Sequence, residues 1–228
     1  MFRTKYRDGW RTKYKSISGT GGSAPSSPWL AGGVDPSSVV AIYRPSIAAS
    51  LAASYLRVAG SGGNANLDPA VVGAGVAPTL ASGAWVFNGS QFLDTGVTSM
   101  PITGSVVIKY NGAVGNLRFI YGSYVSGSSV FALRISDSNS MNPYNGSNAY
   151  FSPALLSGTY SICGKSVYRN SSLEGTISAG GTPPGPSIYI GALNGIGGLF
   201  CTANIQEFFV YSATLTGDQV AAIVAALA

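Results

Sequence analysis

The chain has 228 residues, which is enough to bury one sizeable core and to carry an appendage. Histidine is absent, which removes catalytic schemes built on an imidazole base and the commonest transition-metal ligand. The net charge of +5 comes entirely from residues 1–15, which hold six basic side chains and one acidic side chain. The rest of the chain is formally neutral, which argues against nucleic-acid binding by its folded part.

An N-terminal arm, residues 1–17, repeats the sequence RTKY at positions 3–6 and 11–14. Asp8-Gly9 between the repeats favours a tight turn, although an isolated two-stranded hairpin is only marginally stable in water. The interleaved basic and aromatic side chains suit cation–π and charge-assisted contacts with an acidic protein surface. We therefore expect a docking peptide, with a solvated mobile tail as the alternative. The candidate docking residues are Arg3, Lys5, Tyr6, Arg7, Trp10, Arg11, Lys13, Tyr14 and Lys15.

Residues 18–33 are rich in Gly, Ser and Pro and are expected to form a flexible linker, with Trp29-Leu30 as a candidate anchor onto the domain or onto a partner. The domain is expected to span residues 34–228. It opens on an apolar strand at 39–43, followed by a short helix or irregular turn at 46–56 and a long loop at 59–83.

The stretch 85–97 reads as two short strands joined at Asn88-Gly89, a pair that supplies the positive φ angles of a tight hairpin. Trp85, Phe87 and Phe92 are expected to fill the core. Further strands are expected at 104–110, 117–121, 129–135, 187–191 and 201–211. One or two short strands are expected at 141–151, and two strands that break near Gly164-Lys165 within 158–169, with a turn at 170–175. Short strands separated by Gly, Pro and Asn turns are typical of a β-sandwich.

Within the last strand, period-two alternation places Ile205, Glu207, Phe209 and Tyr211 on one face. The only strong helix is expected at 215–228. Thr216 can cap its N-terminus, and Gln219 stands at the reciprocal position of a capping box.

Two motifs carry a family resemblance. The sequence WVFNGSQFLDTG at 85–96 and the sequence IQEFFVYSATLTGDQVAAI at 205–223 resemble the opening and closing segments of concanavalin A-like (laminin-G-like) jelly rolls, particularly those of phage virion proteins. The resemblance implies an all-β, antiparallel concanavalin A-like jelly-roll sandwich with an extended N-terminal arm and a short C-terminal helix. It also implies a structural role for Glu207 in the closing strand.

The chemistry expected of the domain is limited. Glycosidases of this superfamily need two nearby carboxylates, but the chain has only Glu174 and Glu207 as glutamates, and no predicted strand carries carboxylates at i, i+2 spacing. We therefore predict that the chain is not an enzyme and that it needs no cofactor or metal. Asp94 is either a calcium ligand or a turn cap, and the turn cap is favoured. Cys163 and Cys201 are expected to be reduced and buried, with a disulfide as the alternative.

The leading functional expectation is a non-enzymatic phage virion structural protein, such as a capsid decoration, fibre or tail-associated subunit, anchored by its arm to other virion proteins. Homo-oligomers are expected. No signal peptide and no apolar run of 18 residues is visible in the sequence. Synthesis in the host cytoplasm and no contact with a membrane are therefore expected. The alternative is a carbohydrate-binding adhesin or receptor-binding module, with Tyr144, Asn145, Asn148 and Tyr124 as candidate glycan contacts.

Overall fold

The computed structural model describes residues 27–67, 77–112, 117–136, 140–151, 157–177, 181–194 and 199–228. The arm at 1–17, with all nine candidate docking residues, lies outside these ranges, so its docking role stays a prediction. Most of the predicted linker lies outside them as well.

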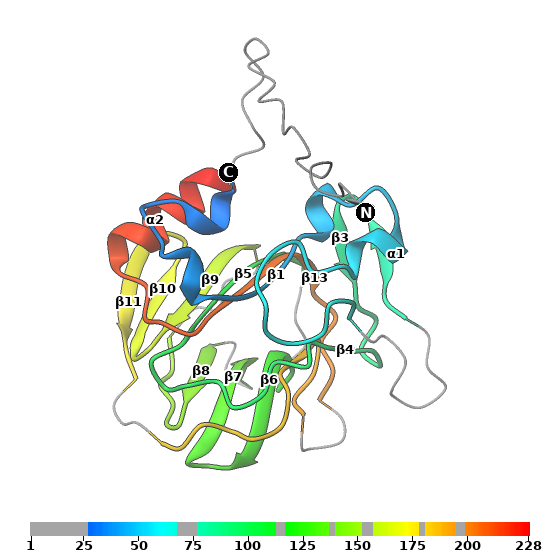
Figure 1. The fold of residues 1–228 in the computed structure, drawn as a ribbon. Helices are drawn as coiled ribbons and strands as arrows, with labels where there is room; N and C mark the ends of the chain where they lie inside the picture. The colour runs from blue at the N-terminus through cyan, green and yellow to red at the C-terminus, as the bar shows by residue number, and fades with distance from the viewer. Residues whose placement is uncertain are drawn as a thin grey trace, which may run out of the picture.

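Two antiparallel sheets face each other and form a sandwich, which confirms the predicted fold class (Figure 1). The larger sheet has eight strands in the order β11-β10-β9-β5-β13-β3-β2, and β1 pairs with β13 beside β3. Its strands are β1 (Val39–Tyr43), β2 (Thr79–Ala81), β3 (Ala84–Val86), β5 (Ser105–Asn111), β9 (Ser157–Cys163), β10 (Ser166–Arg169), β11 (Ser172–Thr176) and β13 (Asn204–Tyr211).

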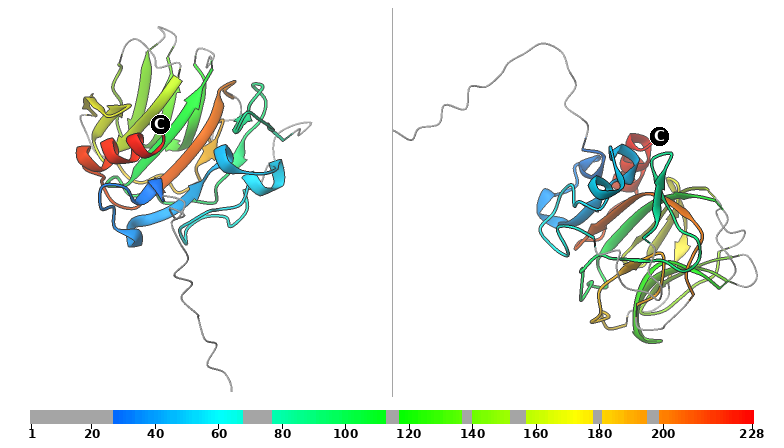
Figure 2. Two further views of the ribbon diagram at one scale, coloured as in Figure 1. Left: turned by 90° about the horizontal axis from the view of Figure 1, so that it is seen from above. Right: turned by 90° about the vertical axis from the view of Figure 1, so that its right-hand side faces the viewer.

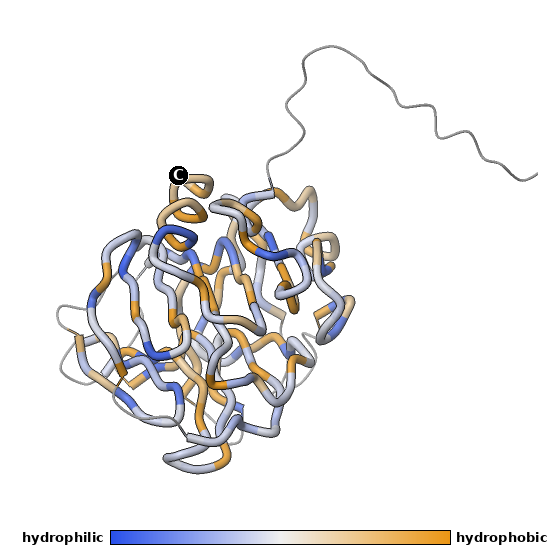
Figure 3. The backbone as a smooth tube through the Cα atoms, turned by 60° about the vertical axis from the view of Figure 1, so that its left-hand side comes forward, coloured by the Kyte–Doolittle hydropathy of each residue, from blue (hydrophilic) through white to orange (hydrophobic). Residues whose placement is uncertain are grey.

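The smaller sheet has five strands in the order β4-β12-β6-β7-β8. Its strands are β4 (Leu93–Asp94), β6 (Phe119–Ser126), β7 (Ser129–Ile135), β8 (Met141–Asn145) and β12 (Tyr189–Ile190). Alternate side chains of both sheets point into the space between them, so that apolar residues recur along the strands (Figure 3). The largest fully buried side chains of this core are Trp85, Tyr43, Tyr110, Tyr121 and Tyr160.

A second apolar layer covers the outer face of the larger sheet. Helix α2 (Gly217–Ala226) lies there beside the N-terminal end of the described chain (Figures 1 and 2). Thr216 and Gln219 form the predicted capping box, and Val220 and Ile223 face the sheet. The one-turn 3-10 helix η1 (Pro28–Leu30) packs against α2.

The anchor predicted at Trp29 is present in this layer. Its ring meets the ring of Phe209 edge-on at 6.4 Å, and its carbonyl oxygen accepts a hydrogen bond from the Tyr211 hydroxyl at 3.0 Å. Two further short 3-10 helices, η2 (Pro36–Ser38) and η3 (Pro45–Ile47), flank β1. One turn of α-helix, α1 (Leu51–Ser54), follows η3. It lies within residues 46–56, for which a short helix or an irregular turn was predicted.

The hairpin predicted at Asn88-Gly89 is wrong. β3 pairs with β2 and β13 in the larger sheet, whereas β4 pairs with β12 in the smaller one, so this turn carries the chain between the sheets. Asn88 serves a local turn, because its side-chain oxygen accepts a hydrogen bond from the Ser90 N–H at 3.2 Å. Trp85 and Phe87 lie in the core between the sheets, as predicted. Phe92 is buried but lies outside that core, because the next residue, Leu93, takes the inward position and the ring of Phe92 stacks on that of Tyr189.

The two-residue hairpin lies slightly upstream. Ser82 and Gly83 have φ angles of 49° and 70°, and they join β2 to β3. Two successive positive φ angles match the right-handed twist of a strand pair. The sequence pattern around Ser82-Gly83 lacks the Asn-Gly or Asp-Gly pair that identifies such turns, and so the prediction chose the wrong place.

Two details of the larger sheet also differ from prediction. An additional residue, Gln206, interrupts the register of β13 with β5 between Ile205 and Glu207. Ile205 therefore joins Phe208 in the core between the sheets instead of sharing a face with Glu207. The turn expected at 170–175 is only two residues long, and β11 begins at Ser172.

Both cysteines are free and buried, which confirms the prediction of reduced thiols. Cys201 lies in the core between the sheets, and Cys163 lies under α2. Burial raises the pKa of the Cys163 thiol to about 12 and that of the Cys201 thiol to about 12. Both groups are therefore protonated and poorly reactive at neutral pH.

Candidate functional site

A pocket opens on the outer face of the five-stranded sheet, where β6, β7 and β8 lie side by side (Figure 1). Its volume is about 170 Å³. We call it the tyrosine pocket, after the two tyrosines in its wall. The residues used below are Phe119, Tyr124, Val130, Arg134, Tyr144 and Leu193.

Strand alternation places these side chains outward. In β7, Phe131, Leu133 and Ile135 point into the core, so Val130 and Arg134 point to the other face. Most of this outer face is apolar. Phe119, Val130 and Leu193 form a small buried cluster there, with Tyr124 and Tyr144 half-buried against it.

One wall of the pocket comes from the chain that follows β12. This segment runs along β6, and the Asn194 N–H donates a hydrogen bond to the Gly122 carbonyl at 3.2 Å. Leu193 lies directly on Gly122, where a Cβ atom would stand 2.5 Å from Leu193 Cδ1 and 2.7 Å from Ala132 Cβ. Glycine is therefore required at position 122 by packing, and Leu193 closes the side of the pocket.

The charge of Arg134 lies against two rings. Its guanidinium carbon is 5.6 Å from the centroid of Phe119 on β6 and 5.5 Å from that of Tyr144 on β8. The two ring centroids are 6.3 Å apart. Burial raises the pKa of the Tyr144 hydroxyl above its ordinary value, and the charge of Arg134 opposes part of that shift. At neutral pH the hydroxyl therefore keeps its proton and can both donate and accept a hydrogen bond.

Further aromatic rings continue along the same sheet. The rings of Phe92 and Tyr189 are stacked with centroids 4.1 Å apart, and Phe200 lies 6.5 Å from Phe92. Tyr189 belongs to β12, where its neighbour Ile190 points into the core, and it pairs with Gly122 of β6. The backbone of Phe200 forms an isolated parallel β-bridge with that of Phe119. This row of rings joins the tyrosine pocket to the β4 edge of the sheet.

The structure places only some of the predicted glycan contacts in the tyrosine pocket. Tyr124 and Tyr144 both line the tyrosine pocket. Asn148 is exposed, and its side-chain hydrogen bond with Tyr144 lowers the pKa of that hydroxyl, against the larger effect of burial. Asn145 is buried on the opposite face of β8, where its amide donates to the carbonyl oxygens of Ile102 and Gly164, both at 2.8 Å. Asn145 lines a separate cavity of about 140 Å³.

Sequence reasoning missed Phe119 and Arg134. The signal for Arg134 was present in the strand predicted at 129–135, where alternation places Arg134 on the face opposite to that of the core-facing Phe131. A half-buried arginine among apolar neighbours is visible only after the strands are paired, because Phe119 and Asn142 flank it from other strands.

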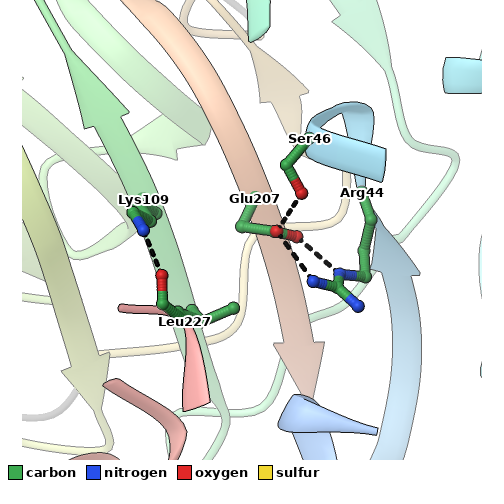
Figure 4. Close-up of polar contacts among 5 residues, drawn as sticks. All are labelled: Arg44, Ser46, Lys109, Glu207 and Leu227. Carbon is green, nitrogen blue, oxygen red and sulfur yellow. Dashed lines mark hydrogen bonds and ion pairs between the residues drawn. The ribbon is translucent and has the colours of Figure 1, made fainter. Parts of the chain in front are cut away.

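The charged residues of the larger sheet serve the fold (Figure 4). Glu207 receives two hydrogen bonds from Arg44, at 2.9 and 3.1 Å, and another from the Ser46 hydroxyl. The guanidinium of Arg44 lies 5.7 Å from the ring centroid of Trp29. Lys109, which pairs with Glu207 in the sheet register, instead donates to the carbonyl oxygen of Leu227 at the end of α2.

Two further described carboxylates also have local partners. Glu174 pairs with Arg169 at 3.1 Å, and Asp94 accepts a hydrogen bond from the Gly96 N–H at 2.8 Å. Asp94 therefore caps a turn, as the sequence favoured. The described ranges hold no group of three His, Cys, Asp or Glu side chains that could bind a metal ion. None of the helices in those ranges is long and apolar enough to cross a bilayer.

Comparisons with known proteins identify the fold. No protein-family model and no curated protein sequence matches the chain. Similar solved structures include Trypanosoma rangeli sialidase in complex with 2,3-difluoro-KDN (TM-score 0.55, 14% identity) and the same enzyme as a covalent intermediate with 2,3-difluorosialic acid (TM-score 0.55, 13% identity). Each match covers 82% of this chain but only about a third of the sialidase chain, 32% and 33% respectively.

A third similar structure matches over nearly its whole length. It is domain 4 of AbnA, a GH43 extracellular arabinanase from Geobacillus stearothermophilus, in complex with arabinotriose (TM-score 0.53, 15% identity). The match covers 82% of this chain and 98% of that domain. At these identities the likeness establishes a shared β-sandwich fold, which this chain has in common with parts of glycosidases.

The prediction that the chain is not an enzyme is wrong as stated. It relied on the absence of histidine and on the spacing of carboxylates in the sequence, which remove particular mechanisms only. The structures that share its fold belong to glycosidases, the sialidase and the arabinanase, and so the fold provides no ground for excluding an enzyme.

Proposed function

We propose that this chain is a carbohydrate-binding domain that holds one sugar ring in the tyrosine pocket. The observation that carries the proposal is the arrangement of Tyr124, Tyr144 and Phe119 around a cavity on the outer face of a sheet. Aromatic rings offer apolar faces to the C–H groups of a sugar, and tyrosine hydroxyls can exchange hydrogen bonds with sugar hydroxyls.

The size of the pocket indicates how much of a glycan it would take. About 170 Å³ is smaller than the roughly 300–1,000 Å³ of pockets that enclose a drug-sized ligand. It therefore suits a single ring or a terminal sugar, and the adjoining row of Tyr189 and Phe200 provides surface for a next ring. The arabinotriose complex of the arabinanase domain, which has the same fold, supports sugar binding as a function of such a sandwich.

Substituting Tyr144→Ala tests this proposal. We expect the affinity for a bound saccharide to fall about tenfold or more, because one wall of the pocket is lost. Arabinotriose and a panel of neutral and acidic mono- and oligosaccharides would be titrated by calorimetry and by ligand-observed NMR. The conservative Tyr144→Phe keeps the ring and should retain much of the affinity.

A matched control is Tyr150→Ala, because Tyr150 is 59% exposed and does not line the tyrosine pocket. It should bind as the parent does. Equal affinities of the parent and Tyr144→Ala for every saccharide bound, or no binding at millimolar concentrations across the panel, would refute the proposal.

A second proposal concerns where the domain is held. We propose that residues 1–17 attach it to another protein assembly, such as a phage capsid or tail. Support comes from sequence alone, namely the confinement of the net charge to the arm and the resemblance of two motifs to virion proteins. A variant lacking residues 1–17 should keep its fold by circular dichroism and lose incorporation into particles. Normal incorporation of that variant would contradict the proposal.

A further inference from the structure

The position of Arg134 indicates which sugars the tyrosine pocket would select. Arg134 stands between Phe119 and Asn142 in the strand register, with one neighbour on each side. Its Nη2 donates to Asn142 Oδ1 at 2.7 Å, and the Asn142 amide nitrogen donates to the Ala149 carbonyl at 2.7 Å. The guanidinium is therefore held in one orientation from the β8 side while it lies against the rings of Phe119 and Tyr144.

One N–H donor of this guanidinium has no acceptor among the described residues. Nε of Arg134 is buried and has no hydrogen-bond partner among the described residues. The guanidinium carries five N–H donors and no acceptor, so a buried N–H of arginine needs an acceptor from another group. A buried donor without an acceptor is unfavourable, and an acceptor supplied by a ligand would remove that cost.

The charge of Arg134 is also uncompensated within the described part of the chain. Among the described residues that line the tyrosine pocket, only Arg134 is charged. The two ion pairs found in the described ranges, Arg44–Glu207 and Arg169–Glu174, involve other arginines. A single guanidinium in an apolar surround favours an anionic partner, and a carboxylate matches its donor geometry.

We propose that the tyrosine pocket selects saccharides that carry a carboxylate, with the carboxylate on Arg134 and the sugar ring against Tyr124 and Tyr144. A carboxylate carries one negative charge and matches one guanidinium, whereas a phosphate ester carries about 1.5 to 2 negative charges and needs more cations than this wall provides. This inference rests on the proposed function, because it presupposes that the pocket binds a sugar.

The test compares sugars that differ only in the carboxylate. D-glucuronate and D-glucose form one pair, and D-galacturonate and D-galactose form another, all titrated against the full chain by NMR and calorimetry. We expect at least one uronate to bind roughly 10- to 100-fold more tightly than its neutral partner. The Nε–H signal of Arg134 should shift on addition of that uronate and not on addition of the neutral sugar.

Two substitutions separate charge from shape. Arg134→Met keeps the aliphatic stem but loses the charge, and we expect it to abolish the preference for the uronate over its neutral partner. Arg134→Lys keeps the charge but loses the planar fork, and should retain only part of the preference. The melting temperature of each variant shows whether the fold is kept, and the Nε–H shift in the parent protein does not depend on any variant.

Asp137 requires its own control, because it lies three positions after Arg134 in the sequence and outside the described residues. Asp137→Asn should bind the uronate as the parent does. A large gain in uronate affinity in this variant would show that an internal carboxylate occupies Arg134, and would overturn the inference.

The remaining outcomes are distinct. Equal affinity for uronate and neutral sugar, or a preference that survives in Arg134→Met, refutes the inference and leaves the proposed function standing. Acetate binding as tightly as glucuronate would reveal an anion site without sugar recognition and would also refute it. Binding of neither member of either pair counts against the inference, and failure of the whole saccharide panel removes the proposed function with it.

Discussion

Substituting Glu207→Gln is expected to lower the free energy of unfolding by about 3–5 kcal/mol. The side chain of Glu207 is 3% exposed and that of Arg44 is 12% exposed, so the ion pair between them is shielded from water. Glutamine keeps an oxygen acceptor but carries no charge. The guanidinium of Arg44, which has lost most of its contact with water, would then have no opposite charge to stabilise it. The measurement is urea unfolding followed by tryptophan fluorescence.

The matched control for this prediction is Glu174→Gln. It breaks the other glutamate–arginine pair, in which the two side chains are 24% and 18% exposed, and should cost clearly less than Glu207→Gln because water reaches more of that pair. The double variant Arg44→Met/Glu207→Leu should recover part of the lost stability by removing both charges. A cost for Glu207→Gln no larger than that of Glu174→Gln would show that the buried pair is not the link that holds β1 and η3 to β13.

The second large effect is expected at Trp85, where substitution by alanine should lower the free energy of unfolding by about 3–5 kcal/mol. Trp85 is fully buried between the sheets, and its ring is stacked on that of Tyr55 at 6.2 Å. Its indole N–H donates to the Ser54 hydroxyl oxygen at 2.7 Å. Removing the ring leaves a cavity beside β3 that the surrounding strands can fill only in part.

Trp85→Phe separates packing from hydrogen bonding. It keeps most of the aromatic surface and loses the N–H, while Ser54 can still donate to the Leu51 carbonyl oxygen, as it does at 2.6 Å. We expect a cost of about 1–2 kcal/mol, clearly below that of Trp85→Ala. Thermal and urea unfolding of both variants would check this order. A loss below 1 kcal/mol for Trp85→Ala would mean that the motif at 85–96 contributes little to the core.

Much of the fold could be predicted from periodicity and composition. The strands β1, β5 and β7 and the helix α2 were expected close to where they lie, since alternating or helical spacing of apolar residues requires a buried face. The reduced, buried state of the cysteines was predicted on a different ground, namely that an unpaired Cys behaves as a small apolar residue. The strands and the helix depend on residues that are close together in the sequence, and the spacing of apolar residues can therefore predict them.

The errors share one physical cause, which is that strand partners are chosen over long distances. Asn88-Gly89 can form a hairpin, but the flanking strands gain more by pairing with β13 and with β12. Gln206 looks like an ordinary strand residue until its register with β5 shows it to be the additional residue of a bulge. In both cases the residue types were compatible with the wrong answer, and the sheet decided between the alternatives.

By itself, then, the sequence determined that this protein is a β-rich sandwich with a capped C-terminal helix and buried thiols, and that its net charge lies in residues 1–15, because each of these depends on nearby residue types. Only the tertiary structure decided where the site lies. The tyrosine pocket needs Phe119, Arg134 and Tyr144 from three neighbouring strands and Leu193 from a segment placed across Gly122. Packing of segments far apart in the chain brings a charge and aromatic rings together, and no pattern along one strand contains that arrangement.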